Sequence, residues 1–131
     1  MTAESTATLL DSIATVVVPV TDQQQALAFY RDALGLELRR DFQAEAGFRW
    51  LEVAPAESAT TIALVPPRGG MWGSVGGDTR IILHSNDITA THAGLRARGI
   101  DVDDTILRLG DHVPPMFRLR DPDGNEIQII G

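Results

Sequence analysis

The chain has 131 residues, no cysteine, and 18 acidic against 11 basic residues, which gives a formal net charge of −7. This length suits one domain that buries a core unaided, and the lack of cysteine excludes a disulfide framework, a thiol nucleophile and a cysteine-based zinc site. The acidic balance argues against nucleic acid and anionic membrane surfaces as partners, and no apolar run is long enough to span a membrane. With Glu4 where a signal peptide would be positively charged, we expect a cytoplasmic protein whose partner is a small molecule or another protein.

The first half of the chain predicts one strand, one helix and three further strands. Residues 1–11 are read as a loose tail, and a β-branched apolar run over residues 13–20 predicts the first strand. Thr21 or Asp22 is expected to cap a helix whose apolar positions follow helical spacing until Gly35 ends it. The three strands that follow are expected over residues 36–42, 48–54 and 60–65.

A connector rich in proline and glycine, residues 67–79, separates this half from a second set of elements in the same order. A helix capped by Asn86 or Asp87 and ended by Gly99 is expected there. The strands around it are expected over residues 80–85, 100–107, 116–119 and 126–130. Between the last two strands lies Asp-Pro-Asp-Gly-Asn at 121–125, where proline and glycine suit a tight hairpin turn with no catalytic role.

The two halves are related by an offset of 65 residues. Residues 17–22 align with residues 82–87, and residues 62–65 align with residues 127–130. Each half alone is too short to bury its apolar face, so the chain is expected to form one domain, residues 1–131, from two packed modules. Module one spans about residues 12–66 and module two about residues 80–131. The groove between them is the expected ligand site.

Three segments carry a resemblance to a known family. They are Asp22 with Ala-Leu-Ala-Phe-Tyr-Arg-Asp-Ala-Leu-Gly-Leu at 26–36, Arg-Ala-Arg-Gly-Ile at 96–100, and the hairpin at 121–125. Together they resemble the vicinal oxygen chelate superfamily, which includes glyoxalase I, bleomycin-resistance proteins, extradiol dioxygenases and fosfomycin-resistance enzymes. The resemblance implies an α+β fold in which two βαβββ modules curl a mixed sheet into a cup with the helices outside. It also implies a homodimer.

The resemblance further locates the positions where metal-using members of that family hold a divalent ion with His and Glu. These positions fall on Thr15, Ala63, Arg80 and Gln128, and the 65-residue offset relates Thr15 to Arg80 and Ala63 to Gln128. None of the four side chains is an ordinary carboxylate or imidazole ligand, and Arg80 itself carries a positive charge. We therefore expect no metal at these positions and no cofactor.

Strand alternation supplies further candidates for the cup, because core positions turn their neighbours to the other face of a sheet. The ligand-binding residues predicted in addition to those four positions are Trp50, Glu52, Trp72, His84 and Arg118. Trp72 lies in the glycine-rich connector and would form either a lid over an aromatic ligand or a cover for a dimer seam. Other interpretations put Trp50 in the core and pair Arg80 and Arg118 with Glu52 or with acids of a second copy.

The leading hypothesis is a metal-independent protein of the glyoxalase/bleomycin-resistance type that holds a small organic molecule by affinity alone. The alternative is a cofactor-independent lyase or isomerase acting on a small carbonyl compound. In that enzyme His84 or Glu52 would act as general base, and Arg80 or Arg118 would stabilise an enolate or oxyanion. A metal-dependent lyase or dioxygenase would need other ligands, from His84, Glu52, Glu126 or a partner chain.

Overall fold

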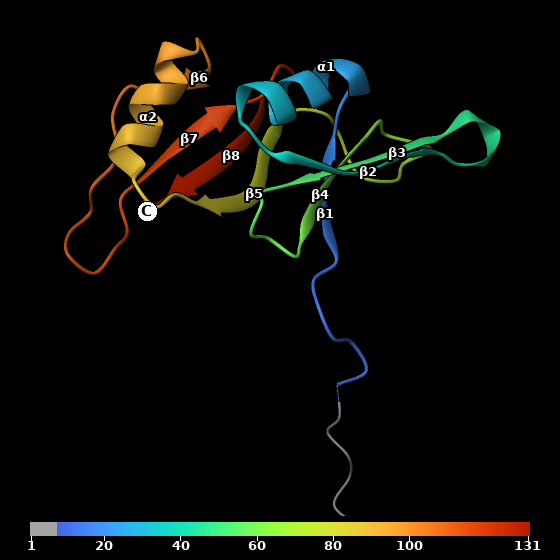
Figure 1. Ribbon diagram of the computed structural model, residues 1–131, viewed down its shortest axis with the longest axis horizontal. Coiled ribbons are helices and arrows are strands. Elements are labelled where there is room, and N and C mark those ends of the chain that lie inside the picture. Colours follow the sequence, from blue (N-terminus) through green and yellow to red (C-terminus); the bar gives the residue numbers. More distant parts are fainter. Residues whose placement is uncertain (1–7) are drawn as a thin grey trace, which may run out of the picture.

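The computed structural model describes residues 8–131 and contains two four-stranded mixed sheets with the two main helices on one side of them (Figure 1). The predicted α+β class is therefore confirmed. In chain order the elements are β1 (Thr15–Pro19), α1 (Gln23–Leu27), η1 (Ala28–Ala33), β2 (Glu37–Gln43), η2 (Glu45–Gly47), β3 (Arg49–Ala54), β4 (Thr61–Val65), β5 (Gly77–His84), α2 (Ile88–Ala97), β6 (Asp101–Val102), β7 (Met116–Arg120) and β8 (Asn125–Ile130).

The two sheets have the same topology. Their strand orders are β1-β4-β3-β2 and β5-β8-β7-β6, so each has one parallel pair at an edge, followed by two antiparallel pairs. In the first sheet Val17 pairs with Ala63, and in the second Ile82 pairs with Gln128. The residue numbers of the second pair are both 65 higher than those of the first, so the repeat in the sequence corresponds to a repeat of strand register.

The helices begin and end where the sequence predicts. The Asp22 carboxylate accepts a hydrogen bond from the Gln25 N–H at 3.0 Å, and Asp87 caps α2 in the same way. After α1 the chain continues as η1, a π-helical segment that the sequence did not predict. Gly35 then ends the helix with a φ of +80°, a backbone conformation that glycine adopts without steric cost.

Two strand boundaries differ from the prediction. Strand β5 begins at Gly77, inside the predicted connector, and the strand predicted over residues 100–107 is reduced to β6. Strand β6 ends because Asp103 pairs with the Arg118 N–H through its carboxylate, at 2.9 Å, while its carbonyl bonds to the His92 ring. Beyond β6 the Asp103 N–H still donates to the carbonyl of Arg118 at 3.0 Å, and a bridge between Leu107 and Met116 continues the pairing.

The hydrophobic core lies between the helices and the faces of the sheets that turn toward them. It is one cluster of buried side chains drawn from both modules: Val18, Val20, Ala26, Leu27, Tyr30, Leu51, Val53, Ile62, Leu64, Ile88, Leu95, Ile100, Phe117, Leu119, Ile127 and Ile129. The core therefore uses one face of each sheet, and the two main helices do not cover the other face. No helix within residues 8–131 is long and apolar enough to cross a membrane.

The last hairpin joins the two modules. Asp121 is buried, and its carboxylate accepts hydrogen bonds from the Tyr30 hydroxyl and from the Asn125 amide, both at 2.8 Å. The same amide donates to the carbonyl of Pro19 in module one at 2.9 Å. Burial, followed by the negative charge of Asp121, raises the pKa of Tyr30 far above its ordinary range, so the phenol stays protonated and donates. The predicted turn thus also anchors the π-helical segment η1, which carries Tyr30, to module two.

Replacing Tyr30 with Phe removes one donor from this buried carboxylate and should lower the free energy of unfolding by about 2 kcal/mol. Denaturant unfolding followed by circular dichroism measures this change. Thr21→Val is the matched control because it removes an exposed hydrogen bond to Asp123 across the same junction, and it should cost less than about 1 kcal/mol. Equal stability of Tyr30→Phe and the wild type would contradict the anchoring role of Asp121.

Gly124 in the hairpin has a φ of +79°, and a Val there should destabilise the protein by at least about 1–2 kcal/mol because a β-branched residue is strained in this conformation. Gly94 in α2 is the control, since an added Cβ meets nothing within 4 Å. Gly94→Ala should stabilise the protein by up to about 1 kcal/mol. A Gly124→Val variant that melts at the wild-type temperature would refute the turn assignment.

Candidate functional site

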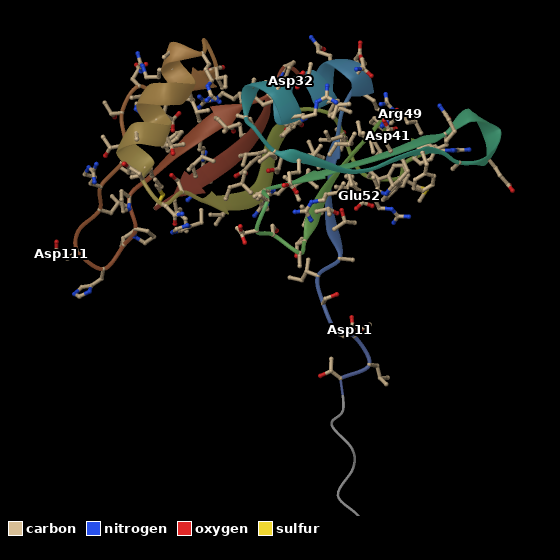
Figure 2. All side chains as sticks on the ribbon, in the orientation of Figure 1. Asp11, Asp32, Asp41, Arg49, Glu52 and Asp111 are labelled. Carbon is tan, nitrogen blue, oxygen red and sulfur yellow. The ribbon has the colours of Figure 1, made fainter. Side chains whose placement is uncertain are left out.

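The free face of the first sheet, which we call the cup face of module one, presents a row of side chains from its four strands. Strand pairing aligns Val17 with Ala63, Ala63 with Glu52, and Glu52 with Arg40. Leu51 lies fully buried on the opposite face, as the strand alternation predicted. Figure 2 shows Glu52 on the side of β3 away from the helices. Glu52 therefore lies on the cup face of module one.

Glu52 is a buried carboxylate, only 6% exposed, and both of its oxygens are engaged. The indole N–H of Trp50 donates to Oε2, and the hydroxyl of Thr61 donates to Oε1 at 2.7 Å. The guanidinium of Arg40 lies 3.7 Å from Oε2. Within residues 8–131 the acid is thus paired with Arg40 and not with Arg80 or Arg118, and it fixes the orientation of the Trp50 ring.

Trp72 reaches back from the connector and completes a group of three rings, Phe48, Trp50 and Trp72, which we call the aromatic cluster. Trp72 stacks on Phe48 with ring centroids 5.4 Å apart and an interplanar angle of 27°, and its edge meets Trp50 at 6.1 Å. The guanidinium of Arg68 lies over Phe48 at 5.1 Å. All three rings are half-buried, so part of each remains accessible.

The backbone of Trp72 has a φ of 67°, in the left-handed region that costs a non-glycine residue energy. Such strain is tolerated where the surroundings hold the residue in place, and it concentrates at functional sites. Here the stacking partners on β3 supply that hold. The aromatic cluster therefore includes one residue, Trp72, whose backbone conformation is strained.

The second sheet has an equivalent cup face with a different chemistry. Ile82 pairs with Gln128, and Gln128 pairs with Arg118, which aligns the three side chains across β5, β8 and β7. Phe117 and Leu119 lie in the core on the other face, as predicted. A cleft of about 210 Å³ opens over β7 and β8, and it is lined by Asp103, Leu107, Met116, Phe117, Arg118, Arg120 and Gln128.

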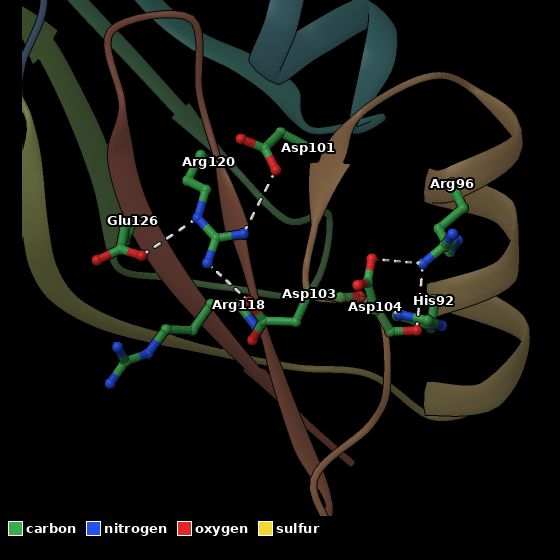
Figure 3. A network of polar contacts seen from close by, with 8 residues as sticks. All are labelled: His92, Arg96, Asp101, Asp103, Asp104, Arg118, Arg120 and Glu126. Atoms are coloured by element: carbon green, nitrogen blue, oxygen red, sulfur yellow. Dashed lines mark hydrogen bonds and ion pairs between the residues drawn. The ribbon is translucent and has the colours of Figure 1, made fainter.

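Two arginines line this cleft, and they differ in the number of acids that pair with them. Arg120 bonds to Asp101, Asp103 and Glu126 at 3.4, 2.7 and 3.2 Å (Figure 3). Burial acts to raise the pKa of Asp103, but hydrogen bonds from Arg120 and from the Arg118 backbone outweigh it, so this pKa lies below its ordinary value. The Arg118 guanidinium points away from this network and lies 4.0 Å from Asp78. Of the two arginines, Arg118 is thus the one whose guanidinium N–H groups could donate hydrogen bonds to a ligand.

The repeat places opposite charges at equivalent positions of the two sheets. Glu52 pairs with Ala63, and Arg118 pairs with Gln128, the residue that the 65-residue offset relates to Ala63. Glu52 therefore occupies in module one the position that Arg118 occupies in module two. The sequence predicted both residues for the cup, but their equivalence depends on strand register.

The four positions that correspond to metal ligands in the family do not form a ligand set. The Thr15 hydroxyl donates to the carbonyl of Thr61 at 3.1 Å, Ala63 offers a methyl group, and the Gln128 amide donates to the sulfur of Met116 at 3.1 Å. Across residues 8–131 no group of three or more His, Asp or Glu side chains could hold an ion. A divalent metal does not fit this donor set.

Arg80, the fourth of these positions, lies in an irregularity of β5. The register shifts between Asp78 and Ile82, and Arg80 takes a φ of 62° while its N–H bonds to the Asp78 carboxylate at 2.8 Å. Its side chain is exposed and makes no hydrogen bond or ion pair within the described part of the chain. In spite of this irregularity the exposed positions of β5 alternate as the sequence predicts, at Arg80, Ile82 and His84.

His84, the predicted general base, is exposed at the end of β5. It lines a separate cleft of about 180 Å³ with Leu34, Pro55, Leu83, Ser85, Thr91, Leu95 and Ile129. That cleft shares no lining residue with the cleft around Arg118. The structure thus brings together Trp50, Glu52 and Trp72 in one group and Arg118 and Gln128 in another, with His84 in neither. Neither Phe48 nor Arg40 was selected as a site residue from the sequence. Phe48 follows the same alternation as Trp50 and Glu52, whereas Arg40 comes into register with Glu52 only past an irregularity in β2.

The sequence profile of the Glyoxalase/Bleomycin resistance protein/Dioxygenase superfamily matches residues 12–129. The antibiotic-binding protein TnmS3 from Streptomyces sp. CB03234 is similar in structure, with a TM-score of 0.78 and 32% identity over 94% of this chain and 97% of that chain. A glyoxalase/bleomycin resistance protein from the same organism has a TM-score of 0.74 and 35% identity, over 92% and 100% of the two chains. A superfamily member from Sphaerobacter thermophilus DSM 20745 has a TM-score of 0.85 and 27% identity, over 94% and 98%. The chain belongs to the glyoxalase/bleomycin resistance protein/dioxygenase superfamily.

Proposed function

We propose that this protein binds a small organic molecule in its cup without a metal ion, and that the ligand carries a planar aromatic group and a carboxylate or carbonyl oxygen. The observation that carries the proposal is the pair of cup faces, one aromatic and one cationic. TnmS3, which is similar over nearly the whole chain, is described as an antibiotic-binding protein, and this supports binding as the general mode of action.

The aromatic cluster supplies the surface for the planar group. Its rings are rigid, partly accessible and held in place, Trp50 by Glu52 and Trp72 by Phe48. Aromatic rings add about 0.5–1.5 kcal/mol through stacking beyond the area that they bury. A planar ligand that extends the stack over Trp72 gains this energy without having to order the side chains first.

Arg118 supplies the contact for the oxygen. Its guanidinium is about half exposed and lies at the limit of ion-pair distance from Asp78, whereas Arg120 is surrounded by three acids. A planar guanidinium can bind a carboxylate through two parallel hydrogen bonds. The Gln128 amide beside it in the sheet offers a further polar group.

Binding is favoured over proton-transfer catalysis by the state of Glu52. Trp50 and Thr61 already donate to its two oxygens and Arg40 lies 3.7 Å from one of them, so the acid is engaged in holding a neighbouring ring in place. His84 lines a different cleft from Arg118, so the base and the oxyanion contact of the alternative hypothesis do not share a pocket.

We also propose that two copies form a homodimer, since the cup faces leave large apolar side chains such as Ile82 more than half exposed. Pairing of the copies would close the open side of each cup. The cytoplasmic location stays a prediction from composition.

The ligand class can be tested with 2-naphthoate, a planar aromatic anion. The chain has two tryptophans, Trp50 and Trp72, and both belong to the aromatic cluster, so intrinsic fluorescence reports on the site alone. We expect saturable quenching by 2-naphthoate and weaker quenching by its saturated analogue, decahydro-2-naphthoate. Trp72→Ala should weaken binding about tenfold, while Trp72→Phe should retain most of it.

The cationic contact is tested in the same titration. Arg118→Met should weaken 2-naphthoate by about tenfold and leave the uncharged 2-naphthamide almost unchanged. Arg31→Met is the matched control, because Arg31 is an exposed guanidinium that pairs with Asp32 on the helix side. If Arg31→Met weakens binding as much as Arg118→Met, or if decahydro-2-naphthoate binds as well as 2-naphthoate, the proposed site is wrong.

The metal-free character is tested by elemental analysis and by chelation. We expect substoichiometric nickel, zinc, iron and manganese in the purified protein, and 2-naphthoate affinity that does not change in excess EDTA. The physical reason is that the four family positions offer a hydroxyl, a methyl group, a guanidinium and an amide. One equivalent of a transition metal that is required for binding would overturn this part of the proposal.

A further inference from the structure

Three rows of side chains cross the cup face of the second sheet, because residues two apart on a strand point to the same face. The first, which we call the acidic row, aligns one residue from each strand: Asp78, Glu126, Arg120 and Asp101. The middle row aligns Ile82, Gln128 and Arg118. The third, which we call the apolar row, aligns Ile130, Met116 and Leu107. The face therefore changes from charged to apolar along β7 and β8.

The acidic row has an excess of negative charge beside the ligand contact at Arg118. Its cation, Arg120, is already paired with three acids (Figure 3). The Asp78 carboxylate at the end of the row accepts a hydrogen bond from the Arg80 N–H at 2.8 Å and lies 4.0 Å from Arg118. An anionic group of a ligand would meet carboxylates here, so this row repels negative charge beyond the single charge that Arg118 can neutralise.

The apolar row forms the opposite end of the cleft over β7 and β8. Leu107 and Met116 both line this cleft, and they are joined by two backbone hydrogen bonds of 2.7 and 3.0 Å. The Gln128 amide donates to the sulfur of Met116 at 3.1 Å, which orients the thioether beside the middle row. The Leu107 side chain is half exposed. The cleft thus offers an apolar wall on the side of Arg118 that is away from the acidic row.

The size of the cleft limits the group that can use this wall. Neighbouring rows lie two residues apart on a strand, which is roughly 7 Å. An enclosed cavity of about 150 Å³ accommodates benzene, so a cleft of about 210 Å³ has room for a carboxylate and a chain of five or six carbons. From a carboxylate held at Arg118, such a chain gains burial against Met116 and Leu107 in one direction and meets carboxylates in the other.

We infer that this cleft binds a monocarboxylate with a short apolar chain, the carboxylate at Arg118 and the chain against Met116 and Leu107. This ligand class rests on the proposed function for its contact at Arg118. It adds to the ligand an apolar substituent that is separate from the planar group on the aromatic cluster. Dicarboxylates are disfavoured, because their second charge would lie on the apolar row or against the acidic row.

Hexanoate tests this ligand class through the methyl signals of methionine. The chain has three methionines, Met1, Met71 and Met116, and of the two that the structure describes Met116 lines the cleft and Met71 does not. In protein labelled with methyl-¹³C methionine, we expect hexanoate to shift the Met116 signal saturably and to leave the Met71 signal in place. Affinity should rise about three- to tenfold from butyrate to hexanoate, since two more methylenes are buried. Adipate, in which a carboxylate replaces the terminal methyl group of hexanoate, should bind at least about tenfold more weakly than hexanoate.

A matched pair of variants tests the direction of the chain. Leu107→Ser should abolish the gain in affinity from butyrate to hexanoate, because it removes the wall against which the longer chain lies. Leu109→Ser is the control, since Leu109 is exposed on the same segment but does not line the cleft, and it should keep the gain. Both leucines are at least half exposed, so unchanged melting temperatures will show that the fold is intact. Arg118→Met should weaken butyrate and hexanoate alike.

The outcomes distinguish this ligand class from the proposed function. Trp72→Ala should leave hexanoate affinity unchanged, because hexanoate does not need the aromatic cluster. The absence of a Met116 shift, adipate that binds as tightly as hexanoate, or equal effects of Leu107→Ser and Leu109→Ser would overturn the inference alone. If Arg118→Met leaves the binding of both 2-naphthoate and hexanoate unchanged, the proposed function fails together with it.

Discussion

One buried carboxylate ties the two modules together, and the geometry of the cup depends on it. A carboxylate as inaccessible as that of Asp121 is tolerated only when donors surround it, and here the donors come from both modules. Tyr30 reaches it from the π-helical segment η1, and Asn125 links it to the end of β1. The helix and the last hairpin are therefore held together on one side of the sheets, which leaves the opposite faces of both sheets for a ligand.

Much of the fold could be predicted because local patterns and tertiary structure agree. Alternating apolar residues mark most of the strands, the caps at Asp22 and Asp87 mark the helices, and the 65-residue offset corresponds to repeated strand register. The exceptions arise from long-range hydrogen bonds. The strand predicted after α2 shortens where the Asp103 carboxylate, in place of a backbone carbonyl, accepts the hydrogen bond from the Arg118 N–H, and no local pattern in the sequence predicts this. The π-helical segment η1 was likewise not predicted, because the spacing of its apolar residues fits an α-helix.

In the site, too, some residues could be predicted from local patterns and others could not. The facing of Glu52 and Arg118 follows from neighbours that belong to the core, so both could be placed in the cup from sequence. The ion-pair partner of Glu52 could not, because Arg40 comes into register only through an irregularity in β2. Trp72 stands in a connector without periodicity, and its stacking on Phe48 depends on a left-handed backbone. Residues in regular strands were predictable, whereas residues positioned by bulges and loops were not.

The central claim is that an aromatic surface and a guanidinium, in place of a metal ion, hold the ligand. A crystal structure of the protein with 2-naphthoate tests this most directly. One electron-density map would show both the bound ring and the four positions at which metal-using members of the family hold their ion. The account predicts the naphthalene ring stacked on Trp72 and the carboxylate hydrogen-bonded to Arg118, with no ion beside Gln128. A transition metal bound at the positions of Thr15, Ala63, Arg80 and Gln128, or a ligand seated outside the cup, would contradict it.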